Sequence, residues 1–344
     1  MNATGEVKPT INDVARLSGV SKKTVSRVIN RSPLLGQATR EKVEAVIADL
    51  GYVPNPQARA LALRRNFLLG LIHDNPNAQM VLSFQQGALE AIRDTEFALV
   101  VRPVDRHSPA LLADLRAFLD AQRLYGVMIL PPLSENDAIS DLCRELGIHY
   151  VRMGSARLDD DAHLVESNDH DAVGAAIEYL ARLGHKRIAI VTGPRGFRSA
   201  LEREAGYNEM MDALHLPHGP ALKAEGNYTF DSGYAAGVRL LEASPRPTAI
   251  FASNDEMAAG VLHAARERGI AVPEQLSIVG FDDTPIAAHI WPPLTTIRWP
   301  IVSMARSAAL KLVDPAKAAE QPFFFHSSLI RRGSASTPDR EQAP

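Results

Sequence analysis

Residues 10–30 read TINDVARLSGVSKKTVSRVIN, and their spacing decides how the chain begins to fold. Val25, Val28 and Ile29 follow one another at the i, i+3 and i+4 spacing that places side chains on one face of a helix. Ser21 precedes them in the position of a helix N-cap, where its hydroxyl can accept a hydrogen bond from the backbone. The stretch therefore predicts a short amphipathic helix that buries this face.

The segments on either side of this helix predict two more. Thr10 and Asp13 have the spacing of a capping box, which marks the start of another helix, N-terminal to the one that Ser21 caps. Gly19 supplies the permissive backbone that a tight turn between the two helices needs. Residues 39–51, TREKVEAVIADLG, predict a third helix that stops at Gly51. Together these signals predict a helix-turn-helix unit.

The polar face of the second predicted helix carries cations. Lys22, Lys23 and Arg27 project away from the apolar side, and no carboxylate lies among them. Residues 1–66 hold 11 Lys and Arg against 5 Asp and Glu, whereas the remainder holds 26 against 35. Such a face is often only solvated. A basic head on an acidic body favours contact with the phosphates of a nucleic acid instead.

A basic segment, GYVPNPQARALALRRN at 51–66, follows the head. Its prolines end the third helix, and the remaining stretch is too short to form a stable helix alone, so we expect it to be disordered until something supports it. Ala58 and Leu61 lie three residues apart among arginines, the composition of an apolar wedge that enters a DNA minor groove. An ordinary basic linker explains the same composition.

The rest of the chain alternates apolar runs with amphipathic segments of helical length. The runs are FLLGLI, FALVV, GVMIL, RIAIVTG, TAIFAS and LSIVGF. This alternation predicts parallel sheets covered by helices. Residues 67–333 are too many for one such core, so we expect two subdomains with a ligand cleft between them, beyond the carboxyl ends of the strands.

Two stretches of the head, together with this body, resemble the lac repressor and galactose repressor family of bacterial transcription regulators. The two stretches are TINDVARLSGVSKKTVSRVIN and TREKVEAVIADLGYVPNPQARAL. The resemblance covers residues 10–333. It implies a helix-turn-helix head and an α/β body of two doubly wound parallel-sheet subdomains, like a type I periplasmic binding protein. It also implies a second helix in the DNA major groove and a hinge that folds on DNA.

The resemblance assigns DNA-contacting residues position by position. Lys22, Lys23 and Arg27 are the expected base-reading residues, and Leu61 with Ala58 is the expected minor-groove wedge. The remaining contacts, most of them to phosphates, are expected from Thr10, Ser21, Thr24, Ser26, Asn30, Arg40 and Asn55. One departure is Gly36, where the family often has a serine cap, and glycine also caps acceptably.

The resemblance also assigns effector-binding residues. The expected set is Asp74, Arg203, Tyr228, Asn254 and Asp282. A guanidinium, an amide and a carboxylate can bind vicinal hydroxyls together, and an aromatic face suits a sugar ring. Arg152 and Met153 stand where many sugar-binding members have an aspartate, which leaves the identity of the ligand open.

Other chemistry finds little support in the sequence. The single Cys143 excludes an internal disulfide and a thiolate metal cluster, and no phosphate loop, nucleophile elbow or helical zinc pair occurs. Asp159–Asp161 are interpreted as a solvated connection, and His185 as a turn residue. We expect no catalytic residue, metal or cofactor. Neither a signal peptide nor a membrane span is predicted, so we expect a cytoplasmic protein that binds no membrane.

The sequence thus predicts a homodimeric repressor of carbohydrate-use genes, released from a near-palindromic operator when a sugar binds. A regulator that uses a nucleobase or another metabolite as co-repressor is the alternative, followed by a sugar-binding transport protein. An enzyme acting on a sugar would need a poised acid, base or nucleophile. The expected divisions are a head at 1–54, a hinge at 55–66, a first subdomain at 67–166 and 293–321, a second at 167–292 and 322–333, and a disordered tail at 334–344.

Overall fold

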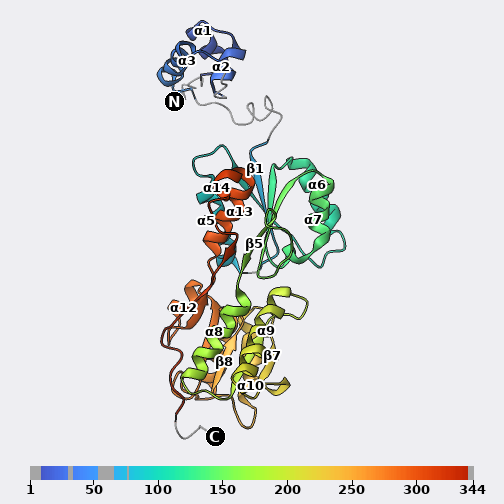
Figure 1. Ribbon diagram of the computed structural model, residues 1–344, viewed down its shortest axis with the longest axis vertical. Coiled ribbons are helices and arrows are strands. Elements are labelled where there is room, and N and C mark those ends of the chain that lie inside the picture. Colours follow the sequence, from blue (N-terminus) through green and yellow to red (C-terminus); the bar gives the residue numbers. More distant parts are fainter. Residues whose placement is uncertain (1–8, 30–33, 53–65, 76, 340–344) are drawn as a thin grey trace, which may run out of the picture. The chain divides into compact units, whose positions relative to one another are not determined.

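A computed structural model of the chain describes residues 9–29, 34–52, 66–75 and 77–339. The chain divides into two compact units, Met1–Phe67 and Leu68–Pro344. Figure 1 labels the helices and strands of both units.

The head is a three-helix unit with a valine core. Its helices are α1 (Ile11–Ser18), α2 (Lys22–Ile29) and α3 (Gln37–Leu50). Four buried valines, Val14, Val25, Val28 and Val43, join the three helices. The turn between α1 and α2 contains Gly19 at φ +64°, a left-handed conformation that glycine adopts without strain. The predicted helix-turn-helix is confirmed.

The helix ends in the head have the predicted chemistry. The Asp13 carboxylate accepts hydrogen bonds from the Thr10 backbone N–H at 3.0 Å and from its hydroxyl at 2.8 Å. The Ser21 hydroxyl accepts one from the Thr24 backbone N–H at 3.1 Å, so Ser21 is the N-cap of α2. Gly51 ends α3 at φ +58°.

The body contains two six-stranded sheets, each between two layers of helices (Figure 1). The first sheet has the order β11 (Phe324–Phe325), β5 (Leu164–Ser167), β4 (His149–Gly154), β3 (Gly126–Ile129), β1 (Leu68–His73), β2 (Ala98–Pro103). The second has the order β12 (Ser328–Ile330), β10 (Thr295–Arg298), β9 (Ser277–Asp282), β8 (Ala249–Ala252), β6 (Ile188–Thr192), β7 (Lys223–Glu225). All neighbouring strands are parallel except β10 and β12.

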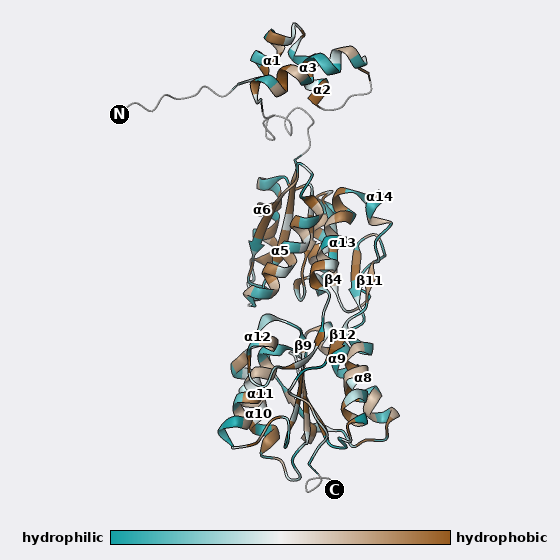
Figure 2. Ribbon diagram, turned by 90° about the vertical axis from the view of Figure 1, so that its left-hand side faces the viewer, coloured by the Kyte–Doolittle hydropathy of each residue, from teal (hydrophilic) through white to brown (hydrophobic). Residues whose placement is uncertain are grey.

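The helices bury the apolar faces of both sheets. Around the first sheet lie α5 (Ala78–Ile92), α6 (Leu111–Gln122), η1 (Leu133–Glu135), α7 (Asp137–Glu145), α13 (Ile301–Val313) and α14 (Pro315–Ala318). Around the second lie α8 (Asp169–Arg182), α9 (Arg198–Ala213), η2 (Pro220–Leu222), α10 (Phe230–Leu241), α11 (Asp255–Glu267) and α12 (Pro285–His289). Figure 2 shows the strands as predominantly hydrophobic, as expected for sheets covered on both faces.

The chain passes between the sheets three times, after β5, after β10 and after β11. The expected division at 166/167 lies at the end of β5. The expected division at 292/293 is wrong, because β10 still pairs with β9 and the first subdomain resumes only with α13. The division at 321/322 is also too early, since β11 pairs with β5. Short strands beside a crossing leave little trace in the hydrophobic pattern.

The sequence predicts a disordered tail at 334–344, and the structure corrects this prediction up to residue 339. Ser334 is fully buried, and its hydroxyl accepts from the Thr295 N–H at 2.8 Å and donates to the Ile278 carbonyl at 2.6 Å. Hydroxyl groups of this segment form hydrogen bonds with backbone groups near the ends of strands. The composition of the segment, which is poor in apolar residues, does not predict such bonds. Residues 340–344 lie outside the described part.

The sequence favours a turn residue at His185, but the structure shows a buried side chain that hydrogen-bonds to three other segments. Its Nδ1 lies 3.0 Å from the Thr248 hydroxyl, and its Nε2 lies 2.9 Å from both the Ser277 hydroxyl and the Ser336 carbonyl. Burial lowers the pKa of His185 to about 4. The imidazole therefore ties the end of the chain to the second sheet.

Candidate functional site

The head presents a cationic face on α2. Lys22, Lys23 and Arg27 are exposed, while Val25 and Val28 on the opposite side are buried. Among the residues that the structure describes, no carboxylate pairs with these three cations. The predicted separation of an apolar face from a cationic face is therefore present.

The other predicted DNA contacts fall into two groups. Thr10 and Ser21 are exposed, and Thr24, Ser26 and Arg40 are half-buried. Asn30, Asn55, Ala58 and Leu61 lie outside the described residues. The wedge assigned to Leu61 and the hinge around it therefore stay predictions.

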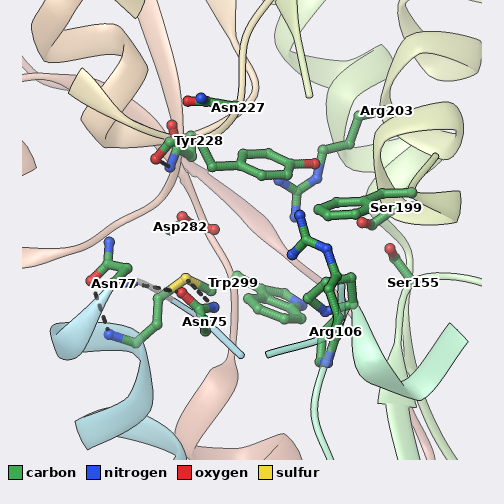
Figure 3. A pocket seen from close by; sticks show the side chains of 15 residues that line it. Asn75, Asn77, Arg106, Ser155, Ser199, Arg203, Asn227, Tyr228, Asp282 and Trp299 are labelled. Carbon is green, nitrogen blue, oxygen red and sulfur yellow. Dashed lines mark hydrogen bonds between the residues drawn. The ribbon is translucent and has the colours of Figure 1, made fainter. Parts of the chain in front are cut away.

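The body has a cavity of about 120 Å³ between its two sheets, at the carboxyl ends of the strands. This is room for a small organic molecule rather than for a single water. Its lining consists of Asn75, Asn77, Met80, Arg106, Pro131, Pro132, Ser155, Phe197, Ser199, Arg203, Asn227, Tyr228, Asn254, Asp282 and Trp299 (Figure 3). Four of the five predicted effector residues, all but Asp74, are in this set.

Asp282 supplies a buried carboxylate to the cavity. It ends β9, is 5% exposed, and has φ +109°, a strained backbone for a residue with a side chain. Among the described residues nothing pairs with its Oδ1. Burial raises its pKa well above the usual range, and the Arg203 guanidinium opposes the shift. A ligand that donates a hydrogen bond would satisfy this oxygen.

Tyr228 and Asn254 form part of the wall contributed by the second subdomain. Asn254 caps α11 by accepting from the Met257 N–H at 2.9 Å, and its Nδ2 donates to the Tyr228 carbonyl at 3.0 Å. Tyr228 has φ +67°, and a side chain at Gly193 would come within 2.2 Å of the Tyr228 hydroxyl. Asn254 thus positions the Tyr228 backbone, and Gly193 leaves room for its ring.

Arg203, on α9, is held by several buried groups. Its Nε donates to the Asp169 carboxylate at 2.8 Å, and its Nη1 donates to the Ser253 carbonyl at 2.6 Å. The guanidinium carbon lies 3.7 Å from the centre of the Phe281 ring. Asp169 is fully buried and in turn accepts from the Ser167 hydroxyl at 2.7 Å. Arg203 therefore lines the cavity and also forms a buried ion pair with Asp169.

Asp74 does not line the cavity. Its buried carboxylate accepts from Arg106 at 2.8 Å, and Arg106 lies over the Phe197 ring at 4.4 Å from its centre. Arg106 comes from the first subdomain and Phe197 from the second. The residue that faces the cavity is Arg106, and Asp74 orients it from behind, which differs from the direct role predicted.

A second contact joins the two subdomains, in addition to that of Arg106 with Phe197. The Glu135 carboxylate, at the end of η1, accepts from the backbone N–H groups of Arg198 at 2.7 Å and Ser199 at 3.2 Å. These groups open α9, whose own N-cap residue, Phe197, provides no side-chain bond. A first-subdomain carboxylate thus caps a second-subdomain helix.

Several lining residues were missed from the sequence. Asn75 and Asn77 belong to the loop HDNPNAQM, which was singled out only for Asp74. Arg106, Phe197 and Trp299 each follow a strand end by a few residues, at the sheet edge where a ligand was expected. Position after a strand was the available signal, but it does not show which loop folds inward.

Arg152 bears on the ligand less than the sequence suggested. It is 2% exposed and donates to the Ser134 carbonyl at 2.6 Å, the Leu158 carbonyl at 2.9 Å and the Asp137 carboxylate at 2.7 Å. None of these contacts faces the cavity. Arg152 holds loops of the first subdomain together.

The aspartates at 159–161 are occupied by neighbours. Oxygens of Asp159 and Asp160 and a His163 nitrogen all lie within 4.8 Å of one another. Asp159 accepts from Arg144 at 3.2 Å and from the Tyr150 hydroxyl at 3.0 Å, and Asp160 lies 2.8 Å from His163 Nδ1. Ion pairs and hydrogen bonds account for this cluster.

No helix in the described ranges has the length and apolar character needed to cross a membrane. Cys143, the single cysteine, is buried in α7, where burial raises the pKa of its thiol to about 12.

Comparisons with known proteins agree with this geometry. The family model "Bacterial regulatory proteins, lacI family" matches residues 10–55, and "Periplasmic binding protein-like domain" matches residues 177–335. The HTH-type transcriptional regulator CelR of Thermobifida fusca is 35% identical over 89% of this chain and 92% of its own. The ribose operon repressor of Escherichia coli strain K12 is 30% identical over 95% and 99%.

Solved structures give the same result. A complex of the transcriptional regulator CelR with cellobiose superimposes with a TM-score of 0.70 at 31% identity, covering 95% of this chain and all of that one. The lac repressor dimer bound to operator and the anti-inducer ONPF gives a TM-score of 0.77 at 29% identity, covering 95% and 99%.

Proposed function

The chain belongs to the lacI family of bacterial regulatory proteins, and on this premise we propose that it is a homodimeric transcriptional regulator whose hold on operator DNA is set by a sugar. The curated relatives that match it are named as regulators and repressors. Two functional surfaces support the proposal, the cationic face of α2 and the cavity of the body.

The α2 face is the proposed reader of DNA. Lys22, Lys23 and Arg27 are exposed on one side of a helix that follows a tight turn, the arrangement in which a recognition helix enters a major groove. Lysine and arginine can donate to guanine edges there or to phosphates. Two such heads related by a two-fold axis would match a near-palindromic site.

The observation that carries the effector proposal is the Asp282 carboxylate. A buried oxygen without a described partner, in a cavity with aromatic walls, fits a ligand with hydroxyl donors and an apolar ring. The charges of Arg203 and Arg106 are already balanced by Asp169 and Asp74. The cavity therefore favours a neutral polyol over an anion.

Ligand binding can reach the DNA through the two subdomains. The cavity has walls from both, so a ligand that contacts both stabilises one of their relative arrangements over the other. We propose that the ligand-bound arrangement releases the operator, so that the sugar acts as an inducer. The sugar would then activate transcription of genes for its own use.

A thermal-shift screen tests the effector proposal. Full-length protein is heated with mono- and disaccharides, nucleobases and nucleosides. We expect at least one sugar to raise the melting temperature in a concentration-dependent way, because a ligand of the folded state stabilises it by mass action. The same measurement on Asn227→Ala, which changes a residue of the cavity lining, tests whether the sugar binds in the cavity, since its stabilising effect should then be smaller. Stabilisation by a nucleobase alone would reject the sugar proposal.

A further inference from the structure

Trp299 lines the cavity, and its indole N–H is already hydrogen-bonded within the protein. It follows β10 at a crossing between the subdomains, lines the cavity, and is 5% exposed. Its Nε1 donates to the Ser167 hydroxyl at 2.9 Å. The polar edge of the indole is therefore used inside the protein, and a ligand can meet only its carbon atoms.

The orientation of this ring is fixed from two sides. Ser167, which accepts from the indole, donates to Asp169 at 2.7 Å, and Asp169 binds Arg203 at 2.8 Å. On the other side, Phe84 of α5 packs edge-on, with ring centres 5.8 Å apart and an angle of 84°. A ring held by a buried polar chain and by an aromatic neighbour cannot easily turn away from the cavity.

The opposite wall is also aromatic. Tyr228 and Phe197 stack with ring centres 6.0 Å apart and an angle of 18°. In Figure 3 the Tyr228 ring lies on one side of the Asp282 carboxylate and the Trp299 ring on the other. The cavity thus has aromatic surfaces above and below, with the polar Asp282 between them.

This arrangement selects for ring stereochemistry. A pyranose with only equatorial hydroxyls exposes C–H groups on both faces and hydroxyls around its rim, and C–H groups suit the electron-rich faces of aromatic rings. An axial hydroxyl would point at one of the aromatic surfaces, where it would lose its hydrogen bonds to water without a new partner. Rim hydroxyls would meet polar groups such as Asp282.

We propose that Trp299 is a second aromatic platform of the cavity, fixed by Ser167, and that it makes the protein select gluco-configured pyranoses, whose hydroxyls at C2, C3 and C4 are all equatorial, over their C4 epimers. The proposal rests on the proposed function, since it specifies which sugars the effector cavity accepts. It adds a specificity-determining residue that the sequence did not indicate.

Epimer pairs test the proposal directly. Glucose differs from galactose, and cellobiose from lactose, only in the orientation of one C4 hydroxyl. Titration calorimetry on full-length protein should show a gluco-configured sugar bound about tenfold more tightly than its galacto partner, the discrimination expected from one unpaired hydroxyl. In Trp299→Ala the preference should fall to about twofold or less, with affinity lowered roughly threefold to tenfold.

Two further variants separate stacking from simple loss of structure. Ser167→Ala keeps the indole but removes its anchor, so it should weaken the epimer preference and shift the fluorescence of Trp299. This emission is read in a Trp291→Phe background, because Trp291, the other tryptophan, is 85% exposed. Trp291→Phe alone is the matched control and should leave the preference intact. These readouts remain informative if Trp299→Ala fails to fold.

The outcomes distinguish the two proposals. Equal or tighter binding of the galacto sugar by the wild-type protein overturns the stereochemical selection. A gluco preference that survives both Trp299→Ala and Ser167→Ala overturns the role of Trp299. Either result spares the proposed function, because a sugar still binds. Failure of every sugar in the pairs and of ribose to bind rejects the sugar cavity and the platform together.

Discussion

Replacing Glu135 by alanine should shift the two subdomains away from the arrangement described here. Glu135 supplies the cap that α9 lacks, through bonds of 2.7 and 3.2 Å to the Arg198 and Ser199 N–H groups. A cap contributes about 1 kcal/mol, and a carboxylate at a helix N-terminus adds about 0.3–1 kcal/mol. The contact therefore favours this arrangement by about 1–2 kcal/mol, or roughly 5- to 30-fold in population.

Distances between spin labels measure this shift without any ligand. Labels at Ala113→Cys on α6 and Asp231→Cys on α10 report one exposed site in each subdomain, and the buried Cys143 should remain unlabelled. Diluting labelled with unlabelled protein suppresses distances between protomers. Glu135→Ala should broaden and displace the distance distribution, and Glu135→Gln should give an intermediate result because an amide still accepts a hydrogen bond.

Glu145→Ala is the matched control, since this first-subdomain carboxylate pairs only with Arg116 on the surface in the described residues. Identical distance distributions for wild-type protein, Glu135→Ala and Glu145→Ala would refute the reasoning. Glu135→Ala should also weaken sugar binding, because Ser199, whose N–H donates to Glu135, lines the cavity.

The remaining predictions concern stability and DNA binding. Asp169→Asn should lower the free energy of unfolding by about 3 kcal/mol in urea titrations, because it leaves Arg203 buried without a counter-charge, whereas the exposed Asp171→Asn should change it little; equal effects would contradict the pairing. Stability should fall as pH drops from about 6.5 toward about 4, since the unfolded chain takes up a proton that folded His185 resists, and His185→Gln should flatten this dependence; an unchanged slope would exclude His185 as its source. Operator affinity should fall with salt at a log-log slope of roughly −0.9 per phosphate contacted, and Lys22→Ala should weaken binding; a flat salt response would refute the head assignment.

The head was predictable because local signals determine it. The Thr10–Asp13 box, the Gly19 turn and the valine spacing each act within a few residues, and all point to the same structure. The doubly wound sheets were predictable for a similar reason, since a strand covered on both faces must be apolar along its length.

The site was only partly predictable, because its members meet through tertiary contacts. Arg203 and Asp282 were predicted by resemblance, but no motif points to the partner Asp169, and Trp299 follows the crossing after β10, which the sequence pattern placed too early. The loop that holds Asp74 does line the cavity through Asn75 and Asn77, yet the Asp74 carboxylate pairs with Arg106 and does not line it. Which side chain of a loop turns inward depends on packing between segments far apart in the chain.

An unbiased selection of double-stranded DNA by the full-length protein, with and without the sugar found in the thermal-shift screen, tests the central claim most directly. We expect enrichment of a near-palindromic sequence and at least a tenfold loss of affinity for it when the sugar is added. Enrichment of no sequence, or of one whose binding ignores every sugar, would contradict the account.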